Sequence, residues 1–338
     1  MPKRIGSHTI FLENKPGIVG NAGVAGKKEG EGPLAAEFDK IFNDEFLGKD
    51  TFEKAESELI KNAVTIALAK AGKTPEEIDC CFAGDLLNQC IGSSFGLREF
   101  GIPFSGLYGA CSTMALSLAL GATLVDSGAL KTAVCATSSH FCSAERQYRN
   151  PLEYGGQRPP SAQWTVTGAG AAVLKQDALE CPRVNAVIFG KIRDLGITDV
   201  NNMGAAMAPA AAQTISAFLT DTKTQPKDFD LILTGDLGKV GSDILKELLI
   251  KENNIDISKV HNDCGILIYD AEAQDVHSGG SGCGCSASVV CSYIINKLRK
   301  RELNRVLFVG TGALLSPTSS LQGESVPGIA HGVLLTSD

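Results

Sequence analysis

The order of apolar and polar positions predicts short strands that alternate with helices. Residues 113–125 are apolar or small and predict a buried helix, and residues 131–136 predict the strand that follows it. The same pattern returns later, as a helix over 287–299 and a strand over 305–309. Strands separated by helices of about a dozen residues are typical of α/β proteins with mixed, mostly parallel sheets.

The chain also repeats itself in three places, always in the same order. Segments 75–85 and 226–236 both predict a helix with Pro in its first turn, followed by a strand that ends in Gly-Asp. Cys-Ser pairs begin a helix at Cys111 and at Cys285, and Gly-rich strands recur at 168–174 and 328–334. We therefore predict two duplicated halves, residues 1–180 and 181–338, although any two α/β units share some of this pattern.

Two further segments carry specific expectations. The stretch between Ser138 and Thr167 is rich in Pro, Gly and Arg, and long structureless insertions of this kind are usually lids or interface arms. The Ala-rich segment 204–219 predicts a helix that packs closely against another helix.

Composition narrows the class of protein. The 338 residues include 31 Lys and Arg against 38 Asp and Glu, a net charge of −7, which argues against a nucleic-acid partner. The 11 cysteines are odd in number and unevenly spaced, which indicates free thiols in the reduced state and not a disulfide framework. No apolar core of an export signal follows Met1, and Gly, Pro and Ser interrupt the uncharged stretch 100–125. We therefore expect a soluble, cytoplasmic protein.

One cysteine occupies a position suited to chemistry. Gly109 and Ala110 permit a tight turn before Cys111, and the helix predicted from residue 113 places its positive dipole end near the thiol. A helix N-terminus favours thiolate, which is the reactive form of cysteine. The alternative is a small, inert core residue, as most free cysteines are.

These motifs resemble those of the thiolase superfamily, which includes thiolases and ketoacyl synthases. The segment 109–112 matches the nucleophile elbow of that superfamily, and the segment 279–288 matches its C-terminal Gly-rich motif. The resemblance implies an α/β fold, a five-layer αβαβα sandwich built from two five-stranded halves, and a homodimer. It also implies that the cysteine accepts an acyl group, assisted by two His or Asn side chains from the second half.

The sequence departs from the superfamily where catalysis needs support. The position that carries a His in ketoacyl synthases falls at Gly235-Asp236, and the second motif offers Cys283-Gly284-Cys285 instead of His or Asn. Without an imidazole, Cys111 lacks the usual general base. We predict a retained fold without catalysis, cofactor or metal. The alternative is an active acyltransferase or ketoacyl synthase that uses Cys111 with His140 or His331 as an unusual base.

A closer resemblance is to the thiolase-like proteins of the stage V sporulation channel assembly in spore-forming bacteria. It rests on segments such as GDLLNQ (84–89), ATSSH (136–140), DLGITD (194–199), HNDCG (261–265) and GALLSP (312–317). The resemblance implies binding of dipicolinic acid (pyridine-2,6-dicarboxylate), alone or with calcium, its transport into the developing spore and its release at germination. Other stage V sporulation channel proteins at the forespore or spore inner membrane would be the partners. A scaffold role without a ligand is a further alternative.

The residue types suggest how such a ligand would be held. Helix N-termini behind Cys111 and Cys285 offer N–H groups to carboxylates, and paired aspartates suit a calcium-bound dianion. The predicted ligand-binding residues are Asp85, Cys111, Ser112, His140, Asp236, Cys283, Cys285, Ser286 and His331. His261, Cys264, Cys283 and Cys285 form a nominal zinc set, but their spacing lacks the paired CxxC pattern, so no metal is predicted.

Overall fold

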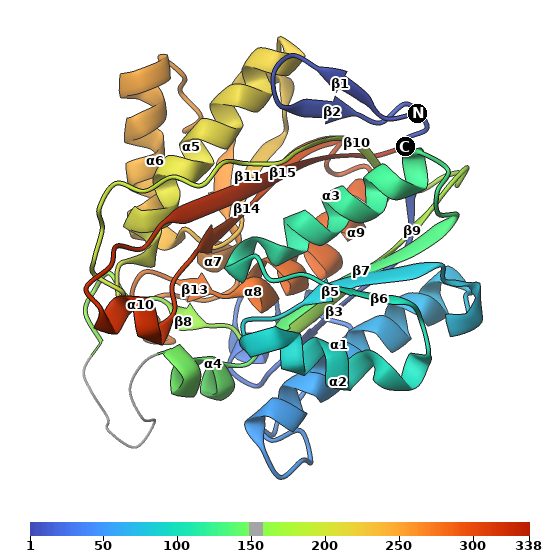
Figure 1. Ribbon diagram of the computed structural model, residues 1–338, viewed down its shortest axis with the longest axis horizontal. Helices are drawn as coiled ribbons and strands as arrows, with labels where there is room; N and C mark the ends of the chain where they lie inside the picture. Colours follow the sequence, from blue (N-terminus) through green and yellow to red (C-terminus); the bar gives the residue numbers. More distant parts are fainter. Residues whose placement is uncertain (149–157) are drawn as a thin grey trace.

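The structure is a computed structural model that describes residues 1–148 and 158–338. Its framework consists of two five-stranded sheets that have the same strand order and are joined edge to edge in one hydrogen-bonded path (Figure 1). The first sheet consists, in spatial order, of β3 (Gly17–Ala25), β9 (Gly168–Lys175), β7 (Thr132–Ser139), β5 (Cys80–Gly84) and β6 (Phe104–Gly106). The second consists of β10 (Arg183–Ile188), β15 (Gly328–Thr336), β14 (Arg305–Ala313), β11 (Leu231–Thr234) and β12 (His261–Asp263).

The pairing directions also repeat. In each sheet the first two pairings are antiparallel and the last two are parallel, so both sheets are mixed. The sheets meet where β10 pairs with β3, at Arg183 and Gly17. The smaller strands are β1 (Lys3–Ile5), β2 (Thr9–Phe11), β4 (Lys40–Ile41), β8 (Trp164–Thr165) and β13 (Gly280–Ser281).

Helices cover both sheets and fill the space between them (Figure 1). The outer helices are α1 (Phe52–Ala71) and α2 (Ile91–Leu97) on the first sheet, and α5 (Met203–Thr222) and α6 (Gly238–Asn253) on the second. The middle layer holds α3 (Thr113–Asp126), α8 (Cys283–Val289), a π-helical turn (Val290–Ile294) and α9 (Ile295–Arg299). Shorter helices are α4 (Phe141–Tyr148), α7 (Cys264–Leu267) and α10 (Pro317–Leu321). This arrangement confirms the five-layer αβαβα sandwich.

The most apolar predicted helix, α3, lies in the middle layer between the two sheets. Helix α3 contacts β5 and β7 of one sheet and β14 and β15 of the other. Its small and apolar residues, among them Met114, Leu118 and Ala122, are fully buried in the main core cluster. A helix that is apolar around most of its circumference is stable only when it is covered on several sides. The predicted helix over 113–125 is therefore confirmed, one residue longer.

Several expected elements have different bounds. The strands predicted over 131–136 and 305–309 run on to Ser139 and Ala313, and the second middle helix begins at Cys283 instead of 287. The helices predicted at Pro75 and Pro226 are wrong, because each is a single 3₁₀ turn between a long helix and the next strand. The reason is local: the chain is extended again at Ile78 and at Phe229, which leaves room for one turn.

The insertion between Ser138 and Thr167 is not structureless throughout, since it contains α4 and β8. Residues 149–157 lie outside the described part of the chain, and the role of the insertion as a lid or interface arm stays a prediction. The close helix packing predicted for the Ala-rich segment is confirmed. A Cβ atom on Gly204 of α5 would lie 2.6 Å from the Leu237 carbonyl oxygen and 2.9 Å from the Gly241 nitrogen of α6.

Candidate functional site

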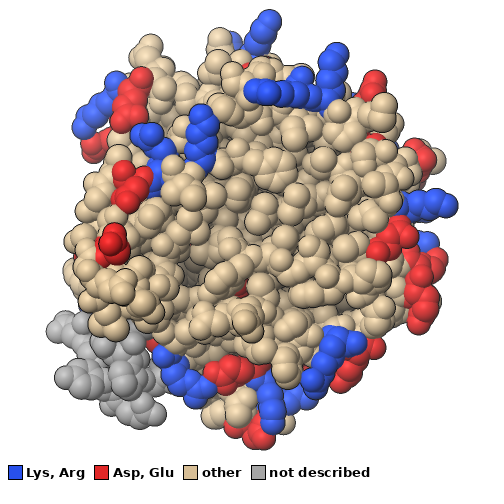
Figure 2. Space-filling model, viewed as in Figure 1, with Lys and Arg blue, Asp and Glu red and all other residues tan. Residues whose placement is uncertain are grey.

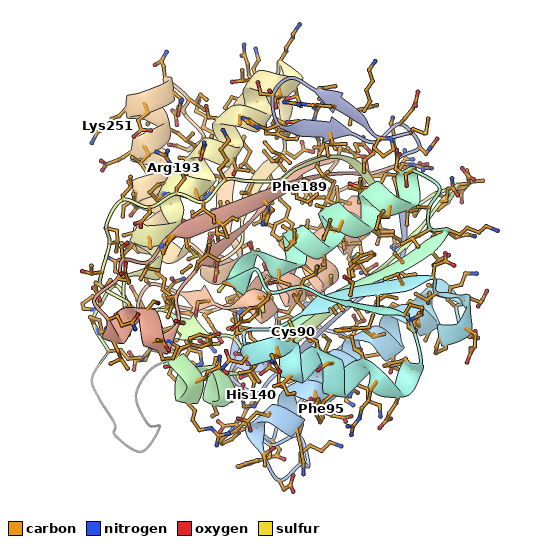
Figure 3. The ribbon with its side chains drawn as sticks, viewed as in Figure 1. Cys90, Phe95, His140, Phe189, Arg193 and Lys251 are labelled. Carbon is orange, nitrogen blue, oxygen red and sulfur yellow. The ribbon has the colours of Figure 1, made fainter. Side chains whose placement is uncertain are left out.

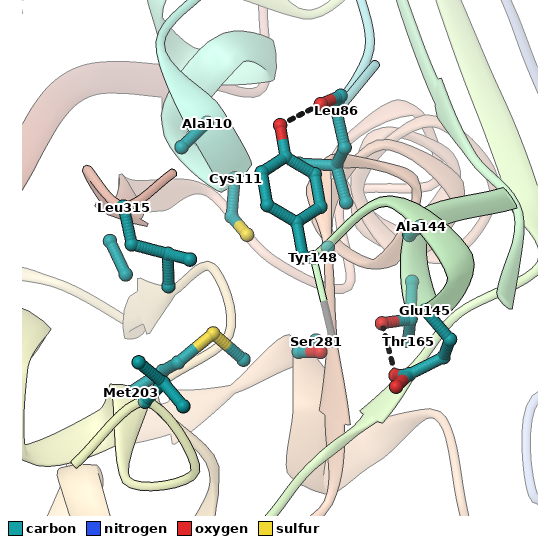
Figure 4. Close-up of a pocket in the computed structure, with 13 residues that line it drawn as sticks. Leu86, Ala110, Cys111, Ala144, Glu145, Tyr148, Thr165, Met203, Ser281 and Leu315 are labelled. Carbon is teal, nitrogen blue, oxygen red and sulfur yellow. Dashed lines mark hydrogen bonds between the residues drawn. The ribbon is translucent and has the colours of Figure 1, made fainter. Parts of the chain in front are cut away.

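A pocket of about 560 Å³, its mouth included, opens beside Cys111 (Figure 4). Both halves of the chain and the segment that follows β7 contribute to its wall. The lining residues are Leu86, Ala110, Cys111, Ala144, Glu145, Tyr148, Thr165, Val200, Met203, Ser281, Gly282, Ala313 and Leu315. The wall is mainly apolar with a few polar groups, as is usual for small-molecule sites.

Backbone geometry before α3 holds the Cys111 thiol at the pocket. Residues Ala110–Ser112 form a 3₁₀ turn, and Ala110 takes a left-handed φ of 50°, which is uncommon for a residue with a side chain. The Ser112 hydroxyl donates to the Gly109 carbonyl oxygen at 2.6 Å, which closes the turn. Cys111 is 6% exposed, and its sulfur points into the pocket (Figure 4). The elbow predicted from the sequence is thus present.

Asp236 is the hydrogen-bond partner of that thiol, and it comes from the other half of the chain. Its carboxylate also accepts a hydrogen bond from the Gly282 N–H at 2.8 Å and from the Thr311 hydroxyl at 2.8 Å. The side chain is fully buried, and burial raises the pKa of the Asp236 carboxyl to about 7, even though its hydrogen bonds act in the opposite direction. The hydrogen-bond partner of the Cys111 thiol is therefore a buried carboxyl.

Cys283 is the residue that the resemblance to the superfamily implies at its second His or Asn position. It lies in one apolar cluster with Cys111, Leu86 and Ala144. Its thiol donates to the Ser138 carbonyl oxygen at 3.0 Å, and burial raises the pKa of this thiol well above the ordinary value. A hydrogen bond from the Gly284 N–H at the start of α8 to the Ser139 side-chain Oγ at the end of β7, 3.0 Å long, helps to fix this position.

Neither histidine proposed as an unusual base lines the pocket. His140 Nε2 donates to the Glu45 carbonyl oxygen at 2.8 Å, and its Nδ1 accepts from the Cys142 N–H at 3.1 Å. His331 Nδ1 accepts from the Gly190 N–H at 3.2 Å. Burial lowers the pKa of both imidazoles, that of His331 to about 4, so both are neutral at pH 7. They serve as buried hydrogen-bonding groups.

The remaining predicted ligand-binding residues also lie behind the pocket wall. Asp85 is buried and accepts hydrogen bonds from Leu87 N–H at 2.8 Å and from the N–H and hydroxyl of Ser93, each at 2.7 Å. Ser112 is used in the elbow, while Cys285 and Ser286 are buried in α8. Of the nine residues, the structure brings together Cys111, Asp236 and Cys283, and only Cys111 lines the pocket.

Sequence reasoning missed most of the pocket wall. Tyr148 on α4 donates to the Leu86 carbonyl oxygen and shares a hydrogen bond of 2.8 Å with Tyr108. Opposite this tyrosine lie Met203 of α5 and Leu315, which follows β14 (Figure 4). Single apolar residues from loops and helix ends give no motif, so no sequence signal marked them.

The nominal zinc set has other roles. His261 Nε2 shares a hydrogen bond of 3.0 Å with the Thr234 hydroxyl, and Cys264 is buried at the start of α7. Within residues 1–148 and 158–338, no group of three or more His, Cys, Asp or Glu side chains has the arrangement of a metal site.

The fold and the cysteine elbow define a thiolase-like protein. The structure is similar to an OleA variant from Xanthomonas campestris, with a TM-score of 0.59 at 14% identity over 98% of this chain and 100% of that one. It is also similar to 3-oxoacyl-[acyl-carrier-protein] synthase III from Aquifex aeolicus VF5, with a TM-score of 0.55 at 13% identity over 95% of this chain and 99% of that one. At these identities the likeness concerns the fold alone.

Sequence comparison identifies a family that is narrower than the one defined by the fold. The model of the family Stage V sporulation protein AD (SpoVAD) matches residues 6–336. The chain is 48% identical over 333 residues to stage V sporulation protein AD of Bacillus subtilis (strain 168), which covers 98% of this chain and 97% of that protein. The chain therefore belongs to the stage V sporulation protein AD family.

The raised pKa of Asp236 leads to a prediction about stability. The folded protein keeps this proton up to about pH 7, whereas the usual value for aspartate is 3.8. The stabilisation is complete below about pH 4 and is lost as the pH rises to 7. Relative to Asp236→Asn, the free energy of unfolding of the wild type should fall by on the order of 2–4 kcal/mol between pH 4 and 8, then level off.

Urea unfolding at stepped pH measures this difference. The control is Asp243→Asn, an exposed position on α6, for which the difference from the wild type should stay flat. Curves for the wild type and Asp236→Asn that remain parallel from pH 4 to 8 would contradict the raised pKa.

Proposed function

We propose that the protein binds dipicolinic acid without catalysis, for transport of this compound into the developing spore and its release at germination. The observation that carries the proposal is the pocket beside the Cys111 elbow. The thiol of this cysteine is hydrogen-bonded to the Asp236 carboxyl and not to an imidazole. A carboxylate beside a thiol opposes thiolate formation, because two negative charges would then be adjacent. Membership of a sporulation family supplies the biological context.

The shape and chemistry of the pocket suit a planar ring with polar ends. Leu86 and Tyr148 face Met203 and Leu315 across the space in front of Cys111 (Figure 4). Such apolar walls can stack against the two faces of a pyridine ring. The Ser281 side chain, which lines the pocket, is the donor that we assign to a ligand carboxylate.

Calcium enters the proposal only as part of the ligand, in a dipicolinate chelate. The carboxylate oxygens of Asp85 and Asp236 already accept hydrogen bonds from protein groups. Coordination of calcium by these side chains would require those bonds to break. We therefore drop the two aspartates as calcium ligands and keep the pocket wall as the binding surface.

Other stage V sporulation channel proteins at the membrane are the partners that we propose. In the described part of the chain, no helix is long and apolar enough to cross a bilayer. Contact with the forespore or spore inner membrane would then run through these proteins, in a peripheral position.

The binding proposal predicts that filling the pocket weakens the complex. Ala313 lies at the end of β14 in the pocket wall, and Ala313→Phe would occupy the space assigned to the ring. We expect an affinity for dipicolinate at least tenfold lower than that of the wild type, because the added ring removes the stacking site. Calorimetric titration with dipicolinate, with and without calcium, measures this effect.

The matched control is Ala205→Phe, on a half-exposed position of α5 that does not line the pocket, and it should bind as the wild type does. Melting temperatures establish that both variants are folded. No binding by the wild type, with or without calcium, would reject the function. Equal binding by Ala313→Phe would reject the pocket and keep the function.

A second candidate is acyl transfer through Cys111, and the bond between Cys111 and Asp236 is the observation that favours it. A carboxyl whose pKa is about 7 is matched to accept a proton at neutral pH. Transfer of the thiol proton to Asp236 keeps the pair singly negative, so it avoids two adjacent charges. The mainly apolar pocket wall also suits an acyl chain.

Mass spectrometry separates the two functions. After incubation with acyl-coenzyme A, acyl transfer predicts an adduct on Cys111 in the wild type that is absent from Cys111→Ala. The binding function predicts an unmodified protein. An acyl-Cys111 adduct would overturn the non-catalytic proposal.

We further propose that the protein is a homodimer whose interface is centred on α3 and β6. Figure 2 shows a broad area without charged side chains in the middle of the face on which α3 lies in Figure 1. Leu116, Leu120 and Leu124 follow one side of α3 and are only partly buried. Phe95 and Phe189 lie on either side of this helix in the view of Figure 3, and Phe95 is 51% exposed.

We propose that a second copy of this chain covers the uncharged face around α3 and β6. Strand β6 ends the first sheet and pairs only with β5 among the described strands, and its Phe104 is 41% exposed. An unpaired edge offers backbone groups to another strand, and an uncharged face meets its own copy across a twofold axis without repulsion. Apolar faces of this extent usually mark interfaces.

Light scattering after gel filtration tests the dimer. Leu120→Glu places a charge in the middle of the uncharged face and should convert the dimer into a monomer. The control Ala69→Glu, on the exposed side of α1, should leave the dimer intact. A wild type that elutes as a monomer, or a dimer that survives Leu120→Glu, would contradict this interface.

A further inference from the structure

Two cysteines from different halves of the chain lie in one buried cluster beside the pocket. Cys111 belongs to the first half and Cys283 to the second, and they share an apolar cluster with Leu86 and Ala144. Cys111 and Cys283 are the two cysteines of this cluster. The proposed function uses Cys111 only as part of the wall and gives Cys283 no role.

The Cys111 and Cys283 thiols differ in their access to the pocket. Of the cysteines in the described part of the chain, Cys111 alone lines the pocket, and its sulfur points into it. Cys283 is fully buried and does not line the pocket. A small oxidant in the pocket therefore reaches Cys111 first, and Cys283 is the other cysteine of the same cluster.

Asp236 provides the proton acceptor that oxidation needs. Thiolate is the form that attacks peroxides, and the Cys111 thiol already donates its hydrogen bond to this carboxylate. We propose that Cys111 and Cys283 form a peroxide-sensitive dithiol that closes to a disulfide beside the pocket. The proposal does not depend on which ligand the pocket binds.

The reaction balances with one hydrogen peroxide per disulfide. Cys111 passes its proton to Asp236, and its sulfur attacks one peroxide oxygen; the O–O bond breaks, a sulfenic acid forms, and the departing hydroxide takes that proton to leave as water. The sulfur of Cys283 then attacks the sulfur of Cys111. The S–S bond forms, the S–O bond breaks, and the hydroxyl leaves with the Cys283 proton as a second water.

The second step should be the slow one. Burial raises the pKa of the Cys283 thiol, and its hydrogen is held by the Ser138 carbonyl oxygen. A resolving thiol that stays protonated attacks slowly. The Cys111 sulfenic acid should therefore persist long enough for dimedone to trap it.

Mass spectrometry of the full-length protein treated with hydrogen peroxide tests the dithiol. We expect the wild type to lose about two mass units, and its non-reduced digest to contain a peptide pair linked through Cys111 and Cys283. With dimedone present from the start, the adduct should form on Cys111 instead. Reduction by dithiothreitol should restore the original mass.

Three variants make the outcome decisive. Cys283→Ser should stop at the sulfenic acid on Cys111, and Cys111→Ser should yield no linked pair. Cys264→Ser, a buried cysteine that does not line the pocket, should behave as the wild type does. The proposal is overturned if the wild type stays fully reduced, if Cys111 links to another cysteine, or if Cys111 is oxidised alike in the wild type and Cys283→Ser.

Discussion

The buried carboxyl of Asp236 is the interaction on which the rest of the site depends. It binds the start of α8 through Gly282, the end of β14 through Thr311, and the Cys111 thiol of the other half. Hydrogen bonds of this kind are strong because no water competes with them, and an unpaired group there would be costly. The elbow, the Gly-rich turn and the sheet end are thereby held in one geometry, and the pocket forms where they meet.

The two matched aspartates, Asp85 and Asp236, have different hydrogen-bond partners in the two halves. Asp85 follows β5 as Asp236 follows β11, yet Asp85 bonds to Leu87 and Ser93 within its own half. It also lies near Glu56, and burial together with the Asp85 charge raises the pKa of that glutamate. One aspartate therefore shapes the loop that carries Leu86, while the other crosses to Cys111. Among the described cysteines, Cys111 is the one that lines the pocket.

The chemistry of the thiol follows from this neighbour. An imidazolium would stabilise thiolate, whereas a carboxylate accepts the thiol hydrogen bond and can only take over its proton. The hydrogen bond between Cys111 and Asp236 bears on three proposals, which differ in the molecule that enters the pocket. A planar dianion is bound without reaction. An acyl thioester would be attacked by Cys111, and a peroxide would oxidise Cys111 and Cys283. The histidines do not bear on this choice, since His140 and His331 are held by backbone groups elsewhere.

The resemblance to the thiolase superfamily implied the five-layer fold and the absence of the usual imidazole beside Cys111. The sequence by itself determined the alternation of strands and helices, the buried helix predicted at 113–125 and the cysteine elbow. These features reside in local patterns, namely periodicity, turn residues and motif spacing. Only the tertiary structure decided that Asp236 and Cys283 join Cys111 while the other predicted residues lie behind the wall, and that Tyr148, Met203 and Leu315 complete the pocket. The physical reason is that a pocket wall is a meeting of distant segments, whose contacts depend on how the sheets and helices pack.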